Sequence, residues 1–270
     1  MPHRIPPRLI QTGPSRDLGL AERAVVANLR LLNPGFEWLY FDDAQVQAFV
    51  EREFPQHLAT FEAFPVRIQK YDFFRYLAVY RLGGFYFDLD VLLAKGVAAL
   101  CELGCVLPFE ELTLQPFLRR QYGLDWEVGN YAFGAAAGHP FLAAVIDNCV
   151  RARQDPRWLD AMLEPLPRLL RQDFYVYDST GPGLVTRTLA EYPRHAPPVT
   201  VLFPEDVCDE RSWHRFGEYG VHLQAGSWRA RGSAWRRRLA LLWERQGRAR
   251  ALREGRQRGK TRLVPIPAGA

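Results

Sequence analysis

The feature that most constrains the fold is a helical pattern followed by two glycines and a strand pattern, over residues 66–93. Val66 to Leu82 carries apolar residues at helical spacing, and Gly83-Gly84 is a typical left-handed end to a helix. The run FYFDLDVLL follows at once and is apolar enough for a buried strand, yet it contains two aspartates. Burying a carboxylate is costly unless it is paired, hydrogen-bonded or bound to a metal. The sequence therefore predicts a helix and a strand whose aspartates need partners.

Strand and helix patterns alternate along the rest of the chain, which favours an α/β domain with a mostly parallel central sheet flanked by helices. Asp42 or Asp43 is expected to cap the second helix. Prolines interrupt the helical pattern at 158–172. The predicted strands are 5–13, 36–41, 85–93, 105–109, 130–138, 199–203 and 220–223, and the predicted helices are 18–32, 43–54, 66–82, 139–153, 158–172 and 184–192.

Composition excludes several classes of protein. The 270 residues are 48% hydrophobic, which is ample for a packed core, and disorder is not expected for most of the chain. No apolar run is long enough for a membrane-spanning helix, and the N-terminus lacks the apolar region of a secretory signal. Cys101 and Cys105 are one residue too far apart for a redox C-x-x-C pair, and no histidine cluster accompanies them, so four reduced thiols are expected.

The net charge of +5 is concentrated at the C-terminus. Residues 229–262 contain 13 Lys/Arg and two Glu, which leaves 22 basic and 28 acidic residues elsewhere. The charge distribution therefore predicts a mildly acidic domain, 1–228, followed by a basic amphipathic helix with an Arg-rich tail, 229–270. Trp235, Leu239, Leu242 and Trp243 lie at helical spacing in the tail, which suits either an anionic membrane surface or packing onto the domain.

The aspartate pair is a candidate metal or ligand site. In a strand, Asp88 and Asp90 point to the same side, and carboxylates without cysteine suit Mg²⁺ or Mn²⁺. The alternative is a pair of strand-end residues that cap a turn, which the apolar residues after them make less favourable. Asp72 and Arg75 share one face of the preceding helix, and their aromatic neighbours argue against a solvated surface pair. Buried ionic groups beside a second carboxylate cluster suggest a binding site.

Taken together, KYDFFRYLAVYRLGGFYFDLDV resembles the sugar-binding region of glycosyltransferase family 32, the D-x-D family that includes yeast-type α-mannosyltransferases. The Asp, the Arg three residues later, Gly-Gly and D-x-D all stand at matching spacing. Further segments resemble the family in the same order: IPPRLIQTG, NPGFEWLYFDD, NYAFGAAAGHPFL, STGPG and VHLQAGSW. Ile10 stands where the family often has His. The resemblance covers about residues 4–228 and leaves the tail uncovered.

The resemblance implies a GT-A fold, a nucleotide-diphosphate-sugar donor, Mn²⁺ or Mg²⁺ as cofactor, and retention at the anomeric carbon. It implies that Asp90 ligates the metal directly and that Asp88 contacts both the metal and the ribose or sugar. Asp72 and Arg75 would hold sugar hydroxyls, and His222 would close the metal site.

The same resemblance assigns the remaining nucleotide-sugar contacts to Gln11, Thr12, Asn130, Ser227 and Trp228. Three of the predicted site residues have an ordinary structural alternative. His222 could be an ordinary core or surface histidine, Asn130 could cap a strand, and Trp228 could anchor the tail by packing. Gly181-Pro182 is expected to shape a loop on the acceptor side.

The predicted function is a metal-dependent retaining glycosyltransferase that acts on a glycan or lipid-linked glycan, in surface polysaccharide synthesis. Glu110, Glu111, Asp125 and Glu127 are candidate acids on the acceptor side, and no nucleophile can be chosen among them. A cytoplasmic enzyme at the inner membrane face fits the composition. The alternatives are a non-catalytic sugar- or metal-binding module of the same fold, and a basic nucleic-acid-associated protein; no nucleic-acid module accompanies the tail.

Overall fold

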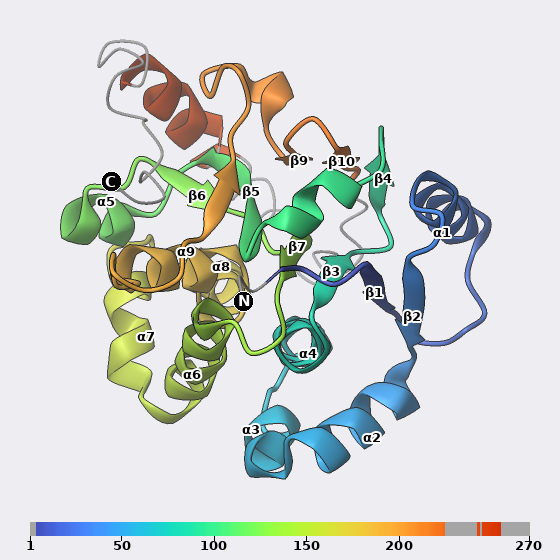
Figure 1. The fold of residues 1–270 in the computed structure, drawn as a ribbon. Helices are drawn as coiled ribbons and strands as arrows, with labels where there is room; N and C mark the ends of the chain where they lie inside the picture. The colour runs from blue at the N-terminus through green and yellow to red at the C-terminus, as the bar shows by residue number, and fades with distance from the viewer. Residues whose placement is uncertain (1–3, 225–241, 244, 255–270) are drawn as a thin grey trace.

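The computed structural model describes residues 4–224, 242–243 and 245–254, and it has an α/β architecture (Figure 1). The helices are α1 (Leu20–Leu32), α2 (Asp43–Glu53), α3 (Leu58–Glu62), α4 (Arg67–Leu82), α5 (Pro116–Tyr122), α6 (Pro140–Gln154), α7 (Pro156–Leu163), α8 (Arg171–Ser179) and α9 (Pro182–Glu191). The strands are β1 (Arg8–Thr12), β2 (Glu37–Phe41), β3 (Gly84–Phe87), β4 (Val91–Leu93), β5 (Cys105–Leu112), β6 (Trp126–Val128), β7 (Ala132–Ala135), β8 (Thr200–Leu202), β9 (Arg215–Phe216) and β10 (Gly220–His222).

The larger sheet has seven strands in the order β2-β1-β3-β7-β5-β6, with β8 paired to β5. Strand β1 is parallel to β2 and to β3, and β8 is parallel to β5. Strand β7 is antiparallel to both β3 and β5, and β6 is antiparallel to β5. The sheet is therefore mixed, with most of its strands pointing the same way, and the predicted α/β class with a mostly parallel sheet is confirmed.

Alternation along the strands divides the core between the two faces of this sheet. Ile10 and Tyr86 belong to the cluster built with α2, α4, α6 and α9. Leu9, Phe85 and Phe87 belong to the other cluster, built with α1, β4 and β9. Successive strand residues point to opposite faces, so Leu9 and Ile10 of β1, and Phe85, Tyr86 and Phe87 of β3, are buried on one face or the other.

Helix α4 and strand β3 form as their sequence predicts. Val66 is the N-cap of α4, and Gly83 ends the helix with a φ of 65°. Gly84 follows with a φ of 115°, and a Cβ there would lie 2.7 Å from the carbonyl oxygen of Arg8. Two glycines are thus required, because both residues adopt positive φ values and the backbone at Gly84 packs closely beside β1.

The run FYFDLDVLL is not one strand, so this part of the prediction was wrong. Strand β3 ends at Phe87, residues 88–90 form a turn, and β4 begins at Val91. Strand β4 pairs with β10 in a separate three-stranded sheet, β4-β10-β9. The turn closes with a hydrogen bond from Val91 N to Asp88 O of 3.2 Å. The two aspartates therefore lie where the chain leaves one sheet for the other.

Other predictions differ at the C-terminal half. The interrupted helix expected at 158–172 is two helices, since α7 ends at Leu163 and α8 begins at Arg171. Helix α5 and strands β6 and β9 are additional elements. In the tail, residues 242–243 and 245–254 are helical, with Ala251 buried. None of the helices in the described ranges is both long and apolar enough to cross a membrane.

Candidate functional site

Arg75 is the centre of a buried polar network at the carboxyl end of β3. Tyr86 faces α4, and Asp88, two residues further on, also faces it. The Arg75 guanidinium lies over the Tyr86 ring at 4.6 Å from its centroid. It contacts both oxygens of Asp88 at 3.2 Å each, which is the paired geometry that guanidinium and carboxylate groups favour. The helix thus supplies the counter-ion for the strand-end carboxylate.

Arg75 also contacts Asp72 one helical turn earlier, at 3.1 Å, and donates to the carbonyl oxygen of Asn130 at 2.8 Å. The Asn130 side chain donates to Asp72 Oδ1 at 3.1 Å and to the Tyr76 hydroxyl at 2.8 Å. Asp72, Arg75 and Asn130 are all buried. The predicted residues Asp72, Arg75, Asp88 and Asn130 are therefore brought together in one connected network.

Asp72 uses both of its oxygens on protein partners. Thr180 donates its hydroxyl to Asp72 Oδ2 at 2.9 Å, and the Thr180 carbonyl accepts from Tyr76 at 2.7 Å. Burial raises the pKa of Asp72 to about 6, against the opposing effect of Arg75 and of the Thr180 hydrogen bond. The STGPG segment that was expected on the acceptor side thus contributes Thr180 to the network around Asp72.

The turn at 88–90 places Asp88 and Asp90 beside His222 of β10. Leu223 N donates to Asp90 O at 2.8 Å, which fixes the end of β10 against the turn. His222 Nε2 lies 3.2 Å from Asp90 Oδ1. One ligand atom from each of Asp88, Asp90 and His222 lies within 4.8 Å of the other two. The three predicted metal ligands therefore converge, although a turn and not a strand presents the two aspartates.

The donor set fits a divalent cation. Burial raises the pKa of Asp88, with Arg75 acting against it. Burial lowers the pKa of His222, but its hydrogen bond to Asp90 and the nearby carboxylates outweigh burial, so the pKa lies above its ordinary value. The raised pKa values mean that Asp88 and His222 both hold protons more tightly than usual. A bound cation would supply the same positive charge in place of those protons. Two carboxylates and one imidazole suit Mn²⁺ well and Mg²⁺ less well.

Tyr131 supports this cluster and was missed from sequence. Its ring stacks on His222, with centroids 4.3 Å apart and an angle of 17°, and its carbonyl oxygen accepts from Asp88 N at 2.8 Å. Tyr86 also donates to Asp88 Oδ1 at 2.8 Å. The sequence offered one indication of this role: Tyr131 directly follows Asn130, a predicted site residue, and so lies close to the site.

Gln11 and Thr12 lie at the end of β1, beside the turn that carries the aspartates. A Cβ on the next residue, Gly13, would lie 2.9 Å from Leu89 Cδ1. Gln11 accepts from Trp38 at 3.0 Å, and Thr12 donates to the carbonyl oxygen of Phe41 at 2.8 Å. Their predicted contact with the nucleotide sugar stays a prediction. Ser227 and Trp228 lie outside the described residues.

The four acids expected on the acceptor side all have partners. Glu110 Oε1 lies 3.0 Å from His214 Nδ1, and Glu111 pairs with Arg248 at 2.9 Å. Glu127 accepts from Tyr177 at 2.7 Å and also from Thr113. Burial raises the pKa of Glu127 to about 7. Asp125 instead lies 3.7 Å from Arg119.

Comparison with known proteins finds similarity over part of this chain. Residues 21–104 match the family described as the glycosyltransferase sugar-binding region containing the DXD motif. The inositol phosphoceramide mannosyltransferase 3 of Schizosaccharomyces pombe is 30% identical over 120 residues, which is 44% of this chain and 30% of that protein. The mannosyl phosphorylinositol ceramide synthase SUR1 of Saccharomyces cerevisiae is 31% identical over 111 residues, 41% of this chain and 25% of that protein.

The chain therefore spans less than half the length of these relatives. Among solved structures, PaToxG Glycosyltransferase has a TM-score of 0.47 and 16% identity, and the match covers 70% of each chain. The matched region contains α4, the two glycines and the turn with both aspartates. Residues 21–104 thus match the DXD-containing sugar-binding region of glycosyltransferases, as the motifs in this segment predict.

Proposed function

We propose that this chain is a metal-dependent glycosyltransferase that moves a sugar from a nucleotide-diphosphate donor to a glycan or lipid-linked glycan. The observation that carries the proposal is the convergence of Asp88, Asp90 and His222 beside the buried network of Arg75. The relatives are named for mannosyl transfer to inositol phosphoceramide, which supports a hexose donor and a phosphate-bearing lipid acceptor.

Asp88, Asp90 and His222 would hold Mn²⁺ or Mg²⁺. A bound cation neutralises the charge that develops on a nucleoside diphosphate when its bond to the sugar breaks. The side chains of Asp88, Asp90 and His222 are each about one-fifth exposed, so a donor can reach this cluster from solvent. The buried Arg75 contacts both oxygens of Asp88 and fixes the orientation of that carboxylate.

The predicted direct contact of Asp72 and Arg75 with sugar hydroxyls belongs to the same proposal. The proposal also includes retention at the anomeric carbon, a cytoplasmic location and contact of the basic tail with an anionic membrane. Since Glu110, Glu111, Asp125 and Glu127 all have protein partners, no nucleophile is assigned.

The test is a thermal-shift screen of nucleoside-diphosphate sugars, including a mannose donor, with and without Mn²⁺. We expect one donor to raise the melting temperature when Mn²⁺ is present, and we expect transfer or hydrolysis of that donor. Asp90→Asn should abolish the reaction and Asp160→Asn, at an exposed aspartate of α7, should not. Full activity in Asp90→Asn, or in excess chelator, contradicts the metal role.

The same screen, together with a nucleic-acid binding assay on the full chain and on a chain without residues 229–270, separates the two alternatives. Donor binding without any turnover would favour a non-catalytic sugar-binding module. Nucleic-acid binding that depends on the tail, with no donor binding by the rest of the chain, would favour a nucleic-acid-associated protein.

A further inference from the structure

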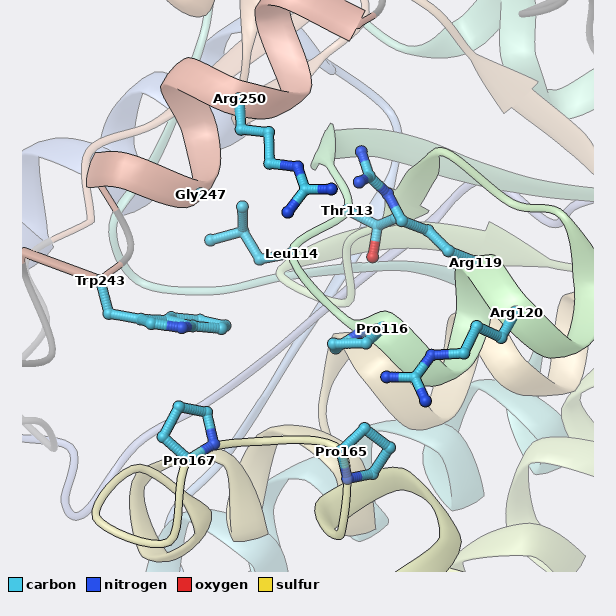
Figure 2. Close-up of a pocket in the computed structure, with 10 residues that line it drawn as sticks. All are labelled: Thr113, Leu114, Pro116, Arg119, Arg120, Pro165, Pro167, Trp243, Gly247 and Arg250. Carbon is cyan, nitrogen blue, oxygen red and sulfur yellow. The ribbon is translucent and has the colours of Figure 1, made fainter.

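A cavity lies between the C-terminal helix, residues 242–243 and 245–254, and helix α5 (Figure 2). It has a volume of about 460 Å³ and shares no lining residue with the metal cluster. Its lining is Thr113, Leu114, Pro116, Arg119, Arg120, Pro165, Pro167, Trp243, Gly247 and Arg250.

One side of the cavity is cationic. Figure 2 shows Arg119 and Arg120 projecting from α5 and Arg250 from the C-terminal helix. Glu254 pairs with Arg119 at 3.1 Å and with Arg250 at 2.8 Å, and Asp125 lies 3.7 Å from Arg119. Of the three arginines, Arg119 and Arg250 thus pair with these two carboxylates. Arg120 is exposed and forms no ion pair with any residue in the described ranges, so this wall keeps positive charge that an anion could neutralise.

The other side is apolar. The Trp243 ring, Leu114 and the two prolines of the turn between α7 and α8 line it (Figure 2). Gly247 shapes the wall, because a Cβ there would lie 2.9 Å from Leu114 Cδ2. The helix can therefore approach the loop before α5 closely enough to form a continuous apolar surface opposite the arginines.

The wall contributed by the C-terminal helix is fixed to the domain. The Trp243 ring packs edge-on against Phe174, with centroids 5.6 Å apart and an angle of 84°. Arg248 pairs with Glu111 at 2.9 Å, and Ala251 is buried. These contacts on both sides of Gly247 make the cavity a feature of the packed chain, and they show that Trp243 packs onto the domain.

We propose that this cavity binds a phosphate ester attached to an apolar chain. Arg120 and Arg250 would hold the phosphate, since guanidinium groups match phosphate oxygens in geometry and charge. Trp243 and the prolines would cover the apolar chain of the ligand. An inorganic ion has no such chain and could not form these contacts. This ligand site is additional to the proposed donor site and does not depend on it.

The test is calorimetric titration of the full chain with dioctanoyl phosphatidate below its micellar concentration. Parallel titrations use inorganic phosphate and dioctanoyl phosphatidylcholine. We expect phosphatidate to bind, and the other two to bind at least about tenfold more weakly, because each lacks either the apolar chain or the net charge. Asp90→Asn should bind phosphatidate as the unaltered chain does, which separates this proposal from the donor site.

Variants locate the site. Arg120→Gln and Arg250→Gln should each weaken phosphatidate binding about tenfold. Arg23→Gln, at an exposed arginine of α1, should leave it unchanged. Trp243→Leu should weaken phosphatidate without changing the response to inorganic phosphate, with the melting temperature as a check on folding. Equal binding of phosphate and phosphatidate, equal binding of phosphatidylcholine, no binding at all, or unchanged binding in both arginine variants would each overturn the proposal.

Discussion

Removal of Arg75 tests the energetic argument for the site. Methionine at this position fills the space of the aliphatic stem but removes the guanidinium, which is 3% exposed and contacts Asp72 at 3.1 Å and Asp88 at 3.2 Å. Breaking a buried ion pair by deleting one partner costs about 3–5 kcal/mol.

Two features of the structure place the expected loss at the lower end of that range. Burial raises the pKa of Asp72 to about 6 although Arg75 lowers it, so without Arg75 the Asp72 carboxyl can take up a proton near neutral pH at little cost. The Asp88 side chain is 25% exposed, so water can replace part of its lost contact. We therefore expect Arg75→Met to lower the free energy of unfolding by about 3 kcal/mol.

The assay is urea unfolding at pH 7.5 in the presence of a chelator, so that metal binding does not contribute. The expected loss corresponds to a fall of about 1 M in the midpoint. Arg81→Met is the matched control on the same helix, because Arg81 pairs with Glu53 at the surface and should cost less than about 1 kcal/mol. Asp72→Asn combined with Arg75→Met should lose less than the sum of the two single variants. Equal losses in Arg75→Met and Arg81→Met would refute the reasoning.

Three further changes test other parts of the chain. His222→Gln should weaken Mn²⁺ binding at least about tenfold in a calorimetric titration, and unchanged affinity would remove His222 from the metal site. Burial raises the pKa of Glu127 from 4.5 to about 7, so the folded chain keeps a proton that the unfolded chain releases, and stability falls as pH rises across that window. Glu127→Gln should flatten this fall in urea unfolding at pH 5 and pH 8, whereas an equal slope in both proteins would assign it to other groups. Gly84→Ala should cost about 1–3 kcal/mol because alanine must adopt a φ of 115° against the Arg8 carbonyl, and an unchanged melting temperature would contradict the strain.

The helix, the two glycines and β3 could be predicted because local signals agree there. The periodic pattern of α4, the left-handed stop at Gly83 and the apolar run of β3 each follow from short-range chemistry. The position of Asp72 and Arg75 on one helical face follows from the same spacing. The end of β3 could not be predicted in this way, because it depends on long-range pairing. Strand β4 leaves the large sheet and pairs with β10, and no local pattern encodes that partner.

The residues that complete the network could not be placed in the same way. Thr180 contacts Asp72 across 108 positions of the chain, and Asn130 does so across 58. Helix α8 could not be predicted as a separate helix, because the helical pattern continues past Pro165 and Pro167 and gives no local sign of a new start. The contact of Trp243 with Phe174 is likewise long-range, and no local pattern encodes it.

The arrangement of β4 and β10 also sets an order of assembly. A growing chain that has reached Asp90 has both carboxylates of the cation site but not His222, which is made near the end of the domain. Strand β4 likewise lacks its β10 partner until that point. The cation site can therefore be completed only after nearly the whole domain has left the ribosome, and a bound cation would then join its first third to its last strand.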